Sequence, residues 1–208
     1  MNMTTGISQR SVLVIGASQR VLDDCVAALR DLGYTAQGTN EFFSDITGRF
    51  DVAHIDLVSL GGLVPSDRKA ELKEQIVAAN PRVIFLDSLA GIPGLIASQV
   101  QEAFTADRQD PAHAPAYAPG DRSIRLTLAD PAAVKMTLWW RTALIPPDPK
   151  SDSLVLFDGQ LPSGDHAIGV PAGFPPETAT PSGQRPAPWF ATVHVGPAIY
   201  NFSIAAGQ

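Results

Sequence analysis

Cysteine is almost absent from this chain of 208 residues, which limits the chemistry the chain can carry. Its single cysteine, Cys25, excludes an internal disulfide. Because Cys25 falls on the apolar side of an expected helix, we interpret it as a buried, unreactive thiol rather than a nucleophile. Long apolar runs are also absent. No stretch approaches the roughly 20 residues of a membrane span, and residues 1–10 lack the apolar region of a secretory signal. We therefore expect a soluble, cytoplasmic protein that does not enter a membrane.

Basic clusters are lacking too, and the formal net charge is −6 with a pI of about 5.1. An acidic chain without a run of Lys and Arg is not expected to bind nucleic acid, because basic side chains hold the phosphate backbone. The histidines have no metal-ligand spacing, so we predict no metal site. They are His54, His113, His166 and His194. No motif predicts a cofactor.

Proline is scarce in the first half, where only three of the 18 prolines lie before residue 107. Residues 105–122, TADRQDPAHAPAYAPGDR, combine proline, alanine and aspartate without an apolar period, which is typical of a linker. We therefore predict an α/β domain over residues 1–106, a linker over residues 107–122 and a second domain over residues 123–208.

The first half alternates short apolar runs with segments of helical periodicity. This alternation predicts a doubly wound α/β fold, with a parallel sheet of about four strands and helices on both faces. The predicted strands are Val12–Ile15, Thr35–Gly38, Asp51–Leu57 and Arg82–Leu86, and the predicted helices are Leu22–Leu32, Glu41–Arg49, Pro65–Ala79 and Leu95–Phe104.

The second half alternates apolar with polar residues, which is the period of half-buried strands. Asp158-Gly159 is a strong signal for a hairpin turn. Trp139 and Trp140 are adjacent, so one ring should face the core and the other should face outward. Short strands with frequent turns favour a small antiparallel β-sandwich. The predicted strands are 124–128, 134–140, 154–157, 168–170, 190–195 and 199–204, and residues 172–188 are predicted to form an irregular loop.

The residues that follow the parallel strands are our candidate ligand-binding residues, because open parallel sheets bind ligands beyond the carboxyl ends of their strands. We expect all of them to converge at one edge of the sheet, and we assign a catalytic role to none. The candidates are Gly16, Ser18, Gln19 and Arg20 after the first strand, Asp56, Gly61 and Gly62 at the end of the third, and Asp87, Ser88 and Gly91 after the fourth.

The first of these turns lacks the features of a dinucleotide-binding loop. Such a loop needs three glycines at fixed spacing so that the backbone can approach a pyrophosphate, whereas Gly16 stands alone. The acidic residue expected at the end of the second strand is missing, since residues 36–40, AQGTN, are neutral. We therefore interpret residues 11–18 as a strand-to-helix turn that needs a small residue.

Residues 49–62, RFDVAHIDLVSLGG, resemble the third strand of response-regulator receiver domains, with Asp56 at the position of the phospho-acceptor. The stretches SVLVIGAS, ALRDLGYTAQGTN and RVIFLDS resemble the surrounding receiver elements in order and spacing. The resemblance covers about residues 10–105, roughly half of the chain. It implies a flavodoxin-like fold for that half.

The departures from the receiver pattern bear on activity. Receivers hold Mg²⁺ with an acidic pair after the first strand, where this chain has Gly16-Ala17-Ser18, and Asp87 replaces the switch residue. The fifth strand and its lysine are missing. A lone carboxylate without a cation site accepts phosphate poorly, because the charge on the transferred group is uncompensated. The resemblance therefore implies a degenerate receiver in which Asp56 is a structural carboxylate.

We interpret the chain as a non-enzymatic regulatory module that acts through protein contacts in bacterial signalling. An alternative is a binding protein or enzyme that holds a small anion or nucleotide in the crevice at the strand ends. A third interpretation makes the second domain a carbohydrate or peptide binder. With only four strands, Arg82–Leu86 would form an open sheet edge. Either a second copy of the chain, in a homodimer, or the strand Ile124–Leu128 is expected to cover it.

Overall fold

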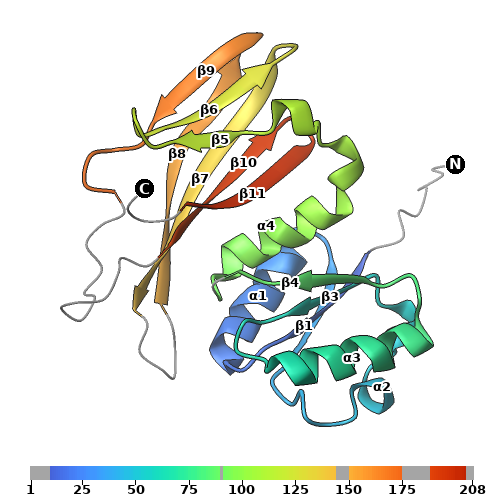
Figure 1. The fold of residues 1–208 in the computed structure, drawn as a ribbon. Helices are drawn as coiled ribbons and strands as arrows, with labels where there is room; N and C mark the ends of the chain where they lie inside the picture. The colour runs from blue at the N-terminus through green and yellow to red at the C-terminus, as the bar shows by residue number, and fades with distance from the viewer. Residues whose placement is uncertain (1–9, 90, 144–149, 175–187, 205–208) are drawn as a thin grey trace, which may run out of the picture. The chain divides into compact units, whose positions relative to one another are not determined.

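The computed structural model describes residues 10–89, 91–143, 150–174 and 188–204. The chain divides into two compact units, Met1–Ala97 and Ser98–Gln208. The first is a parallel sheet with helices and the second is built from antiparallel sheets (Figure 1), as the sequence predicts. No helix among these described residues is long and apolar enough to cross a membrane.

The first unit contains a parallel sheet in the order β2-β1-β3-β4. Every residue of β3 and nearly every residue of β1 is buried, because both faces of these central strands are covered. The sheet and its helices fit a Rossmann-like or flavodoxin-like fold. The strands are β1 (Ser11–Ile15), β2 (Thr35–Thr39), β3 (Leu57–Leu60) and β4 (Ile84–Asp87).

Helices cover both faces of this sheet. The helices α2 (Ile46–Arg49) and α3 (Ser66–Ala79) share a hydrophobic cluster with Leu13 and Val58 on one face. The helix α1 (Gln19–Asp31) lies on the other face and buries Leu22, Cys25 and Leu29. The helix α4 (Pro93–Phe104) follows β4 and continues into the second unit.

The third strand begins six residues later than the sequence predicts. Polar and apolar side chains alternate from His54 to Leu57, but the buried run Leu57–Leu60 forms β3 instead. The preceding residues form the 3-10 helix η1 (Val52–His54), which buries Val52 but leaves the His54 side chain 83% exposed. The Asn80 side chain fixes this segment by donating to the carbonyl oxygens of Val52 and Ile55, at 3.0 and 2.8 Å.

The second unit is a sandwich of two antiparallel sheets, in the orders β11-β10-β7-β8 and β5-β6-β9. Alternate residues of both sheets form its hydrophobic core. Phe174, which follows β9, joins this core and meets Trp140 and Trp189 edge to face. The strands are β5 (Ala116–Ala118), β6 (Ser123–Leu128), β7 (Ala132–Ala143), β8 (Lys150–Leu161), β9 (Gly164–Gly169), β10 (Trp189–Val195) and β11 (Ala198–Ile204).

Two predictions about the second half are wrong. The predicted linker contains the 3-10 helices η2 (Ala106–Arg108) and η3 (Pro111–His113) and the strand β5, which pairs with β6. The division between the compact units instead falls within α4, after Ala97. The predicted turn at Asp158-Gly159 lies inside β8, which continues to Leu161, so the chain turns before Gly164 at φ +118°. Most of the predicted loop 172–188 lies outside the described residues.

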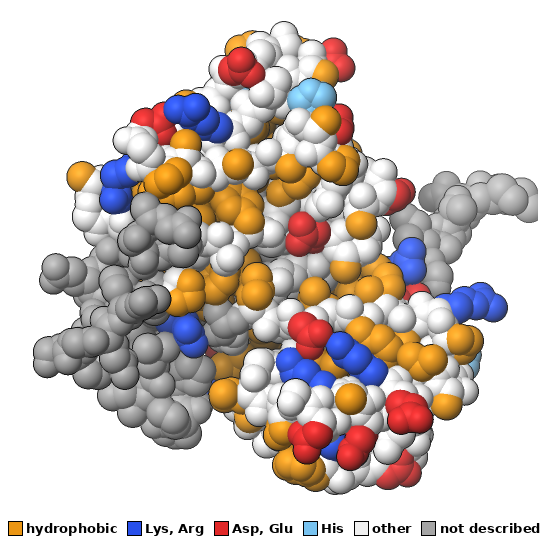
Figure 2. Space-filling model, viewed as in Figure 1, with side chains coloured by type: hydrophobic (Ala, Val, Ile, Leu, Met, Phe, Trp, Pro, Cys, Tyr) orange, Lys and Arg blue, Asp and Glu red, His pale blue; other side chains and the backbone are white. Residues whose placement is uncertain are grey.

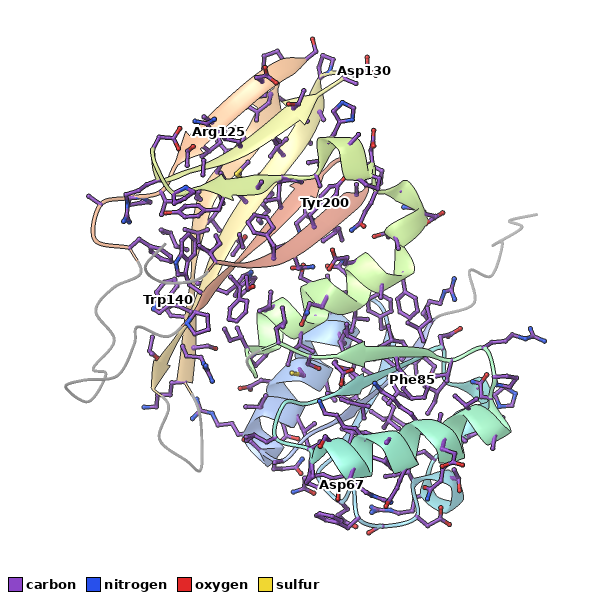
Figure 3. The ribbon with its side chains drawn as sticks, viewed as in Figure 1. Asp67, Phe85, Arg125, Asp130, Trp140 and Tyr200 are labelled. Atoms are coloured by element: carbon purple, nitrogen blue, oxygen red, sulfur yellow. The ribbon has the colours of Figure 1, made fainter. Side chains whose placement is uncertain are left out.

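The tryptophan pair behaves as strand alternation predicts. Trp140 is buried in the sandwich core (Figure 3), and Trp139 on the opposite face donates its indole N–H to Thr192 Oγ1 at 2.9 Å. Cys25 is fully buried, and burial raises the pKa of its thiol to about 12, with a smaller contribution from Asp24. The interpretation of Cys25 as an inert thiol therefore stands.

Candidate functional site

The structure brings nine of the ten candidate residues to the carboxyl edge of the parallel sheet. They end or follow β1, β3 and β4, whose carboxyl ends meet there because neighbouring strands run parallel. They are Gly16, Ser18, Gln19, Arg20, Gly61, Gly62, Asp87, Ser88 and Gly91.

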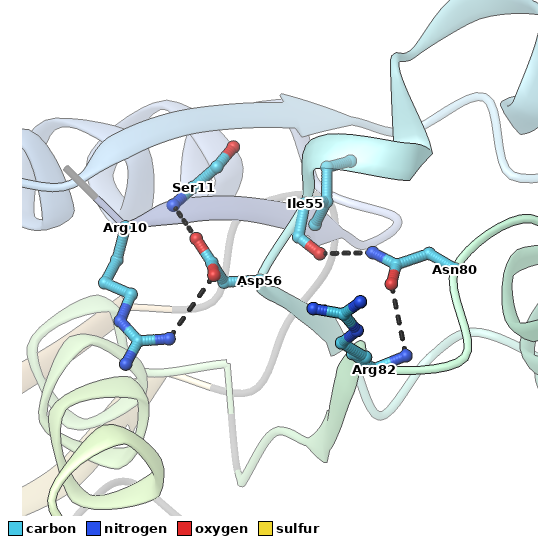
Figure 4. A network of polar contacts seen from close by, with 6 residues as sticks. All are labelled: Arg10, Ser11, Ile55, Asp56, Asn80 and Arg82. Carbon is cyan, nitrogen blue, oxygen red and sulfur yellow. Dashed lines mark hydrogen bonds and ion pairs between the residues drawn. The ribbon is translucent and has the colours of Figure 1, made fainter. Parts of the chain in front are cut away.

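The tenth candidate, Asp56, lies at the opposite edge, and its predicted placement is wrong. Because β3 begins at Leu57, Asp56 precedes the strand instead of ending it. Its carboxylate accepts hydrogen bonds from the Ser11 backbone N–H at 2.7 Å and from the Arg10 guanidinium at 3.3 Å (Figure 4). Asp56 therefore ties the start of β1 to the start of β3, far along the strand from the other candidates.

The two glycines at the ends of β1 and β3 lie against each other. The Gly16 N–H donates to the Thr39 carbonyl at 3.1 Å and the Gly61 N–H donates to the Ile15 carbonyl at 2.8 Å. A Cβ at Gly61 would lie 3.3 Å from the Gly16 Cα and 3.2 Å from the Ile15 oxygen. Glycine is thus required for close approach of two chain segments, and both N–H groups already have acceptors within the protein.

The hydroxyl groups at this edge also bond internally. Ser18 is the N-cap of α1, where its Oγ accepts from the Val21 N–H at 3.4 Å. Ser88 Oγ is hydrogen-bonded to Ser59 Oγ, and both serines are buried. Gln19 donates to Asp23 one turn along α1, at 2.8 Å. These groups stabilise the edge and are not directed at a ligand.

Asp87 is held by two lysines that the sequence reasoning did not connect with it. Lys69 Nζ and Lys73 Nζ lie 3.0 and 2.9 Å from its two carboxylate oxygens. The hydrogen bonds from Lys73 and then Lys69 hold the pKa of Asp87 below its ordinary value. Lysines four residues apart on one helix face give a sequence signal for such a clamp, but their acceptor becomes evident only once β4 is placed.

These contacts leave the carboxyl edge with little chemical capacity. Within the part of the chain that the structure describes, no group of three or more His, Cys, Asp or Glu side chains is arranged to hold a metal ion. Figure 2 shows acidic and basic side chains together over α3 and β4, with hydrophobic side chains beside them. Charge is thus compensated locally at this edge of the unit.

The side of β4 away from β3 presents a different feature. The Ile84 N–H donates to Asp56 O and the Ser88 N–H to Leu60 O, each at 2.9 Å, so even-numbered residues of β4 face β3. The intervening Phe85 and Asp87 therefore direct their N–H and C=O groups outward. Among the described residues, no hydrogen bond reaches those four groups. The strand is apolar in its centre, and Ile84 is 37% exposed.

The expectation that Ile124–Leu128 covers this edge is wrong. These residues belong to β6, which pairs with β5 on one side and with β9 on the other. Both of its backbone edges are therefore occupied within the sandwich, so β6 has no edge with which to extend the parallel sheet.

The outer edge of β11, in the sandwich, is covered by side chains of its own unit. Glu102 accepts from the Asn201 backbone N–H at 3.1 Å and from Asn201 Nδ2 at 2.9 Å. Gln109 Nε2 donates to the Ile199 carbonyl and, at 3.0 Å, to Glu102. The Tyr200 hydroxyl, on the same strand (Figure 3), accepts from the Asp110 N–H at 3.0 Å.

Comparison of the chain with models of known protein families, with curated proteins and with solved structures finds no match.

Proposed function

We propose that the chain is a protein-interaction module whose docking surface is the outer edge of β4, built on a receiver-like frame without phospho-acceptor chemistry. The observation that carries this proposal is the outward-facing backbone of Phe85 and Asp87, flanked by apolar side chains. An edge with unbonded N–H and C=O groups is a template for another strand, and strand addition is a common way to bind an extended segment.

The carboxyl edge supports a non-enzymatic function rather than the alternative of an anion or nucleotide site. The N–H groups of Gly16 and Gly61 and the Ser88 hydroxyl bond within the protein, and Asp87 balances part of the lysine charge. A phosphate group would have to displace these hydrogen bonds, whose donors and acceptors already have partners within the protein. Binding of this kind is therefore disfavoured at the crevice.

Hydrogen exchange of the full chain at low concentration tests the docking surface. The amides of Phe85 and Asp87 should exchange rapidly, because they have no acceptor, whereas those of Ile84 and Ser88 should be protected by β3. The last two amides are matched controls within the same strand. Slow exchange at Phe85 and Asp87 in the monomer would mean that the chain covers its own edge, and the proposal would be wrong.

Incubation with acetyl phosphate and Mg²⁺ tests the absence of phospho-acceptor chemistry. We expect no stable label, because Asp56 lies at the amino edge, bonded to Ser11 and Arg10, with Gly16-Ala17-Ser18 at the other edge. A label present in the natural chain and lost in Asp56→Asn would contradict this part of the proposal.

A further inference from the structure

The two faces of the sheet differ in chemistry beside the open edge of β4. On one face, Phe85 packs against the hydrophobic cluster to which α3 contributes, and Asp87 bonds to two lysines of α3. Because side chains alternate along a strand, Ile84 and Leu86 point to the opposite face. A strand added at this edge would therefore present one set of alternate side chains to α3 and the other set to Ile84 and Leu86.

The face toward α3 carries more positive than negative charge next to the edge. Lys69 and Lys73 share the single carboxylate of Asp87, and among the described residues they form no other ion pair. Each ammonium has three N–H donors, of which one bonds to Asp87, so donors remain for a second carboxylate. Lys73 Nζ also lies 5.9 Å from the centre of the Phe85 ring, which places this charge beside the middle of the strand.

The opposite face of the strand is apolar, with Ile84 37% exposed and Leu86 half-buried. Apolar side chains of a partner would remove this surface from water, which is favourable. On the lysine face, apolar side chains would cover an ammonium group without compensating its charge, and basic side chains would repel it. Carboxylate side chains are the group that suits that face.

We infer that the segment bound at the β4 edge is an extended stretch of another protein in which acidic side chains alternate with apolar ones. The acidic side chains lie toward Lys69 and Lys73, and the apolar ones lie toward Ile84 and Leu86. This inference rests on the proposed function, since it requires the edge to be open. It adds the chemical class of the partner and the face on which each kind of side chain lies.

Peptide binding to the full chain tests the class of partner. The probes are end-blocked peptides of sequence Val-Glu-Val-Glu-Val and two analogues with Gln or Lys in place of Glu, and the Phe85 and Asp87 amide signals report binding in an NMR titration. The Glu peptide should bind about threefold more tightly than the Gln peptide, because partly exposed ion pairs contribute modestly, and the Lys peptide should bind most weakly. The difference should shrink at about 0.5 M salt.

Variants of the chain test the face that selects the acidic side chains. Lys73→Met should remove most of the preference for Glu over Gln, because Lys69 and Asp87 then balance each other, and should change the affinity for the Gln peptide by less than about twofold. Arg20→Met is the matched control, since it removes the same charge from α1 on the other face of the sheet. It should leave the preference unchanged.

A methylated backbone tests whether the peptide adds as a strand. The Glu peptide with N-methylated amides keeps its charge but has no N–H donors, so it should bind at least about tenfold more weakly than the unmethylated peptide. Equal binding of the two would mean that the lysines attract the peptide without strand addition, which overturns the inference.

The outcomes separate this inference from the proposed function. If the Glu and Gln peptides bind equally, or if no probe binds at millimolar concentration while the Phe85 and Asp87 amides exchange rapidly, the edge is open but acidic side chains do not select its partner. A chain that dimerises with protection of those amides has a second copy as the occupant, which also overturns this inference alone. Protection of the same amides in the free monomer overturns both.

Discussion

The strands β4 and β11 both end a sheet, yet their outer edges are treated differently. At β11, Glu102 and Gln109 bond to the backbone groups of Asn201 and Ile199 that face away from β10. At β4, the corresponding groups of Phe85 and Asp87 have no partner among the described residues. An open strand edge is thus not an unavoidable result of either fold, because side chains from one helix and from the residues that follow it are enough to cover an edge.

The two edges also differ in the charge beside them. The carboxylate of Glu102 acts directly on the β11 backbone, whereas the carboxylate of Asp87 turns to Lys69 and Lys73 and leaves its own N–H uncovered. Side-chain coverage at β11 prevents another strand from adding there. The short length of β4 limits how strongly a partner strand can bind, and the charges at its two ends limit which segments can bind. Neither feature covers the edge.

The largest expected effect comes from uncovering β11. Glu102→Ala removes both hydrogen bonds to Asn201 and leaves a part-buried backbone N–H without an acceptor, which should lower the free energy of unfolding by about 2–3 kcal/mol. Urea unfolding followed by tryptophan fluorescence measures it. All three tryptophans, at 139, 140 and 189, lie in the sandwich, so the signal reports that unit.

Glu74→Ala is the matched control, since Glu74 is an exposed glutamate of α3 and its loss should change the stability by less than about 0.5 kcal/mol. Equal effects of the two variants would mean that the cover on β11 is not a stabilising feature, and the contrast between the edges would lose its energetic basis.

A second, smaller effect is expected one strand further in. Thr192 Oγ1 accepts from Trp139 Nε1 and donates to Asn201 Oδ1 at 2.6 Å, which orients Asn201 toward Glu102. Thr192→Val keeps the shape but leaves both partners short of a bond, at a cost of about 1–2 kcal/mol in the same unfolding measurement.

The control for Thr192 lies directly opposite it on β7. Thr137 pairs with Thr192 across the strands but makes no side-chain hydrogen bond to a described residue. Thr137→Val should therefore have a clearly smaller effect. If the two valine variants unfold alike, the polar chain from Trp139 to Glu102 does not contribute to covering β11.

The local sequence pattern predicts the open edge of β4, but it does not predict the side chains that cover the edge of β11. The apolar runs of β1 and β4, the Ser18 cap and the periodicity of α1 identify the parallel sheet and its edge from sequence. The partnership of Glu102 with Asn201 spans 99 residues, and no local period carries it. The residues after Glu102 are predicted to be a linker because they lack an apolar period. Their hydrogen bonds join polar groups of Gln109 and Asp110 to a strand that is distant in sequence.

The misplacement of Asp56 has a related cause. The alternation over residues 54–57 satisfies the strand pattern as well as the run 57–60 does, and only packing decides between them. Burial of four consecutive residues in β3 between two layers of helices favours the later start. An error of a few residues along a strand then moves a candidate side chain from one edge of the sheet to the other.

A modest effect is expected when the lysine clamp beside the β4 edge is weakened. The folded-state pKa of Asp87 lies below its ordinary value of about 3.9, so its stabilising contribution is present above that pH and is lost as pH falls through the folded-state pKa. Lys73→Met should raise the Asp87 pKa in a carboxyl NMR titration. Because the Asp87 side chain is 55% exposed, the stability at neutral pH should fall by less than about 1 kcal/mol.

The companion variant Lys69→Met should act in the same direction by a smaller amount, since Lys73 contributes the larger lowering. Rapid exchange of the Phe85 amide should persist in both variants, because the open groups of β4 are backbone atoms. Slow exchange of the Phe85 amide in Lys73→Met at neutral pH would contradict this expectation and show that the lysine clamp keeps the edge open.

The smallest effect is expected at His194, on the strand beside β11. Burial, with a smaller contribution from Lys135, lowers the pKa of His194 below its ordinary value of about 6.5. The unfolded chain therefore binds more protons than the folded one between those two values, and stability should decrease as pH falls below about 6.5. His194→Gln should flatten this part of the stability curve of the sandwich, measured by urea unfolding at a series of pH values. Lys135→Gln should flatten it only in part, since burial remains. An unchanged curve in His194→Gln would mean that water reaches the charged imidazole in the folded chain. The contrast between the covered edge of β11 and the open edge of β4 would then rest on the Glu102 and Gln109 hydrogen bonds alone.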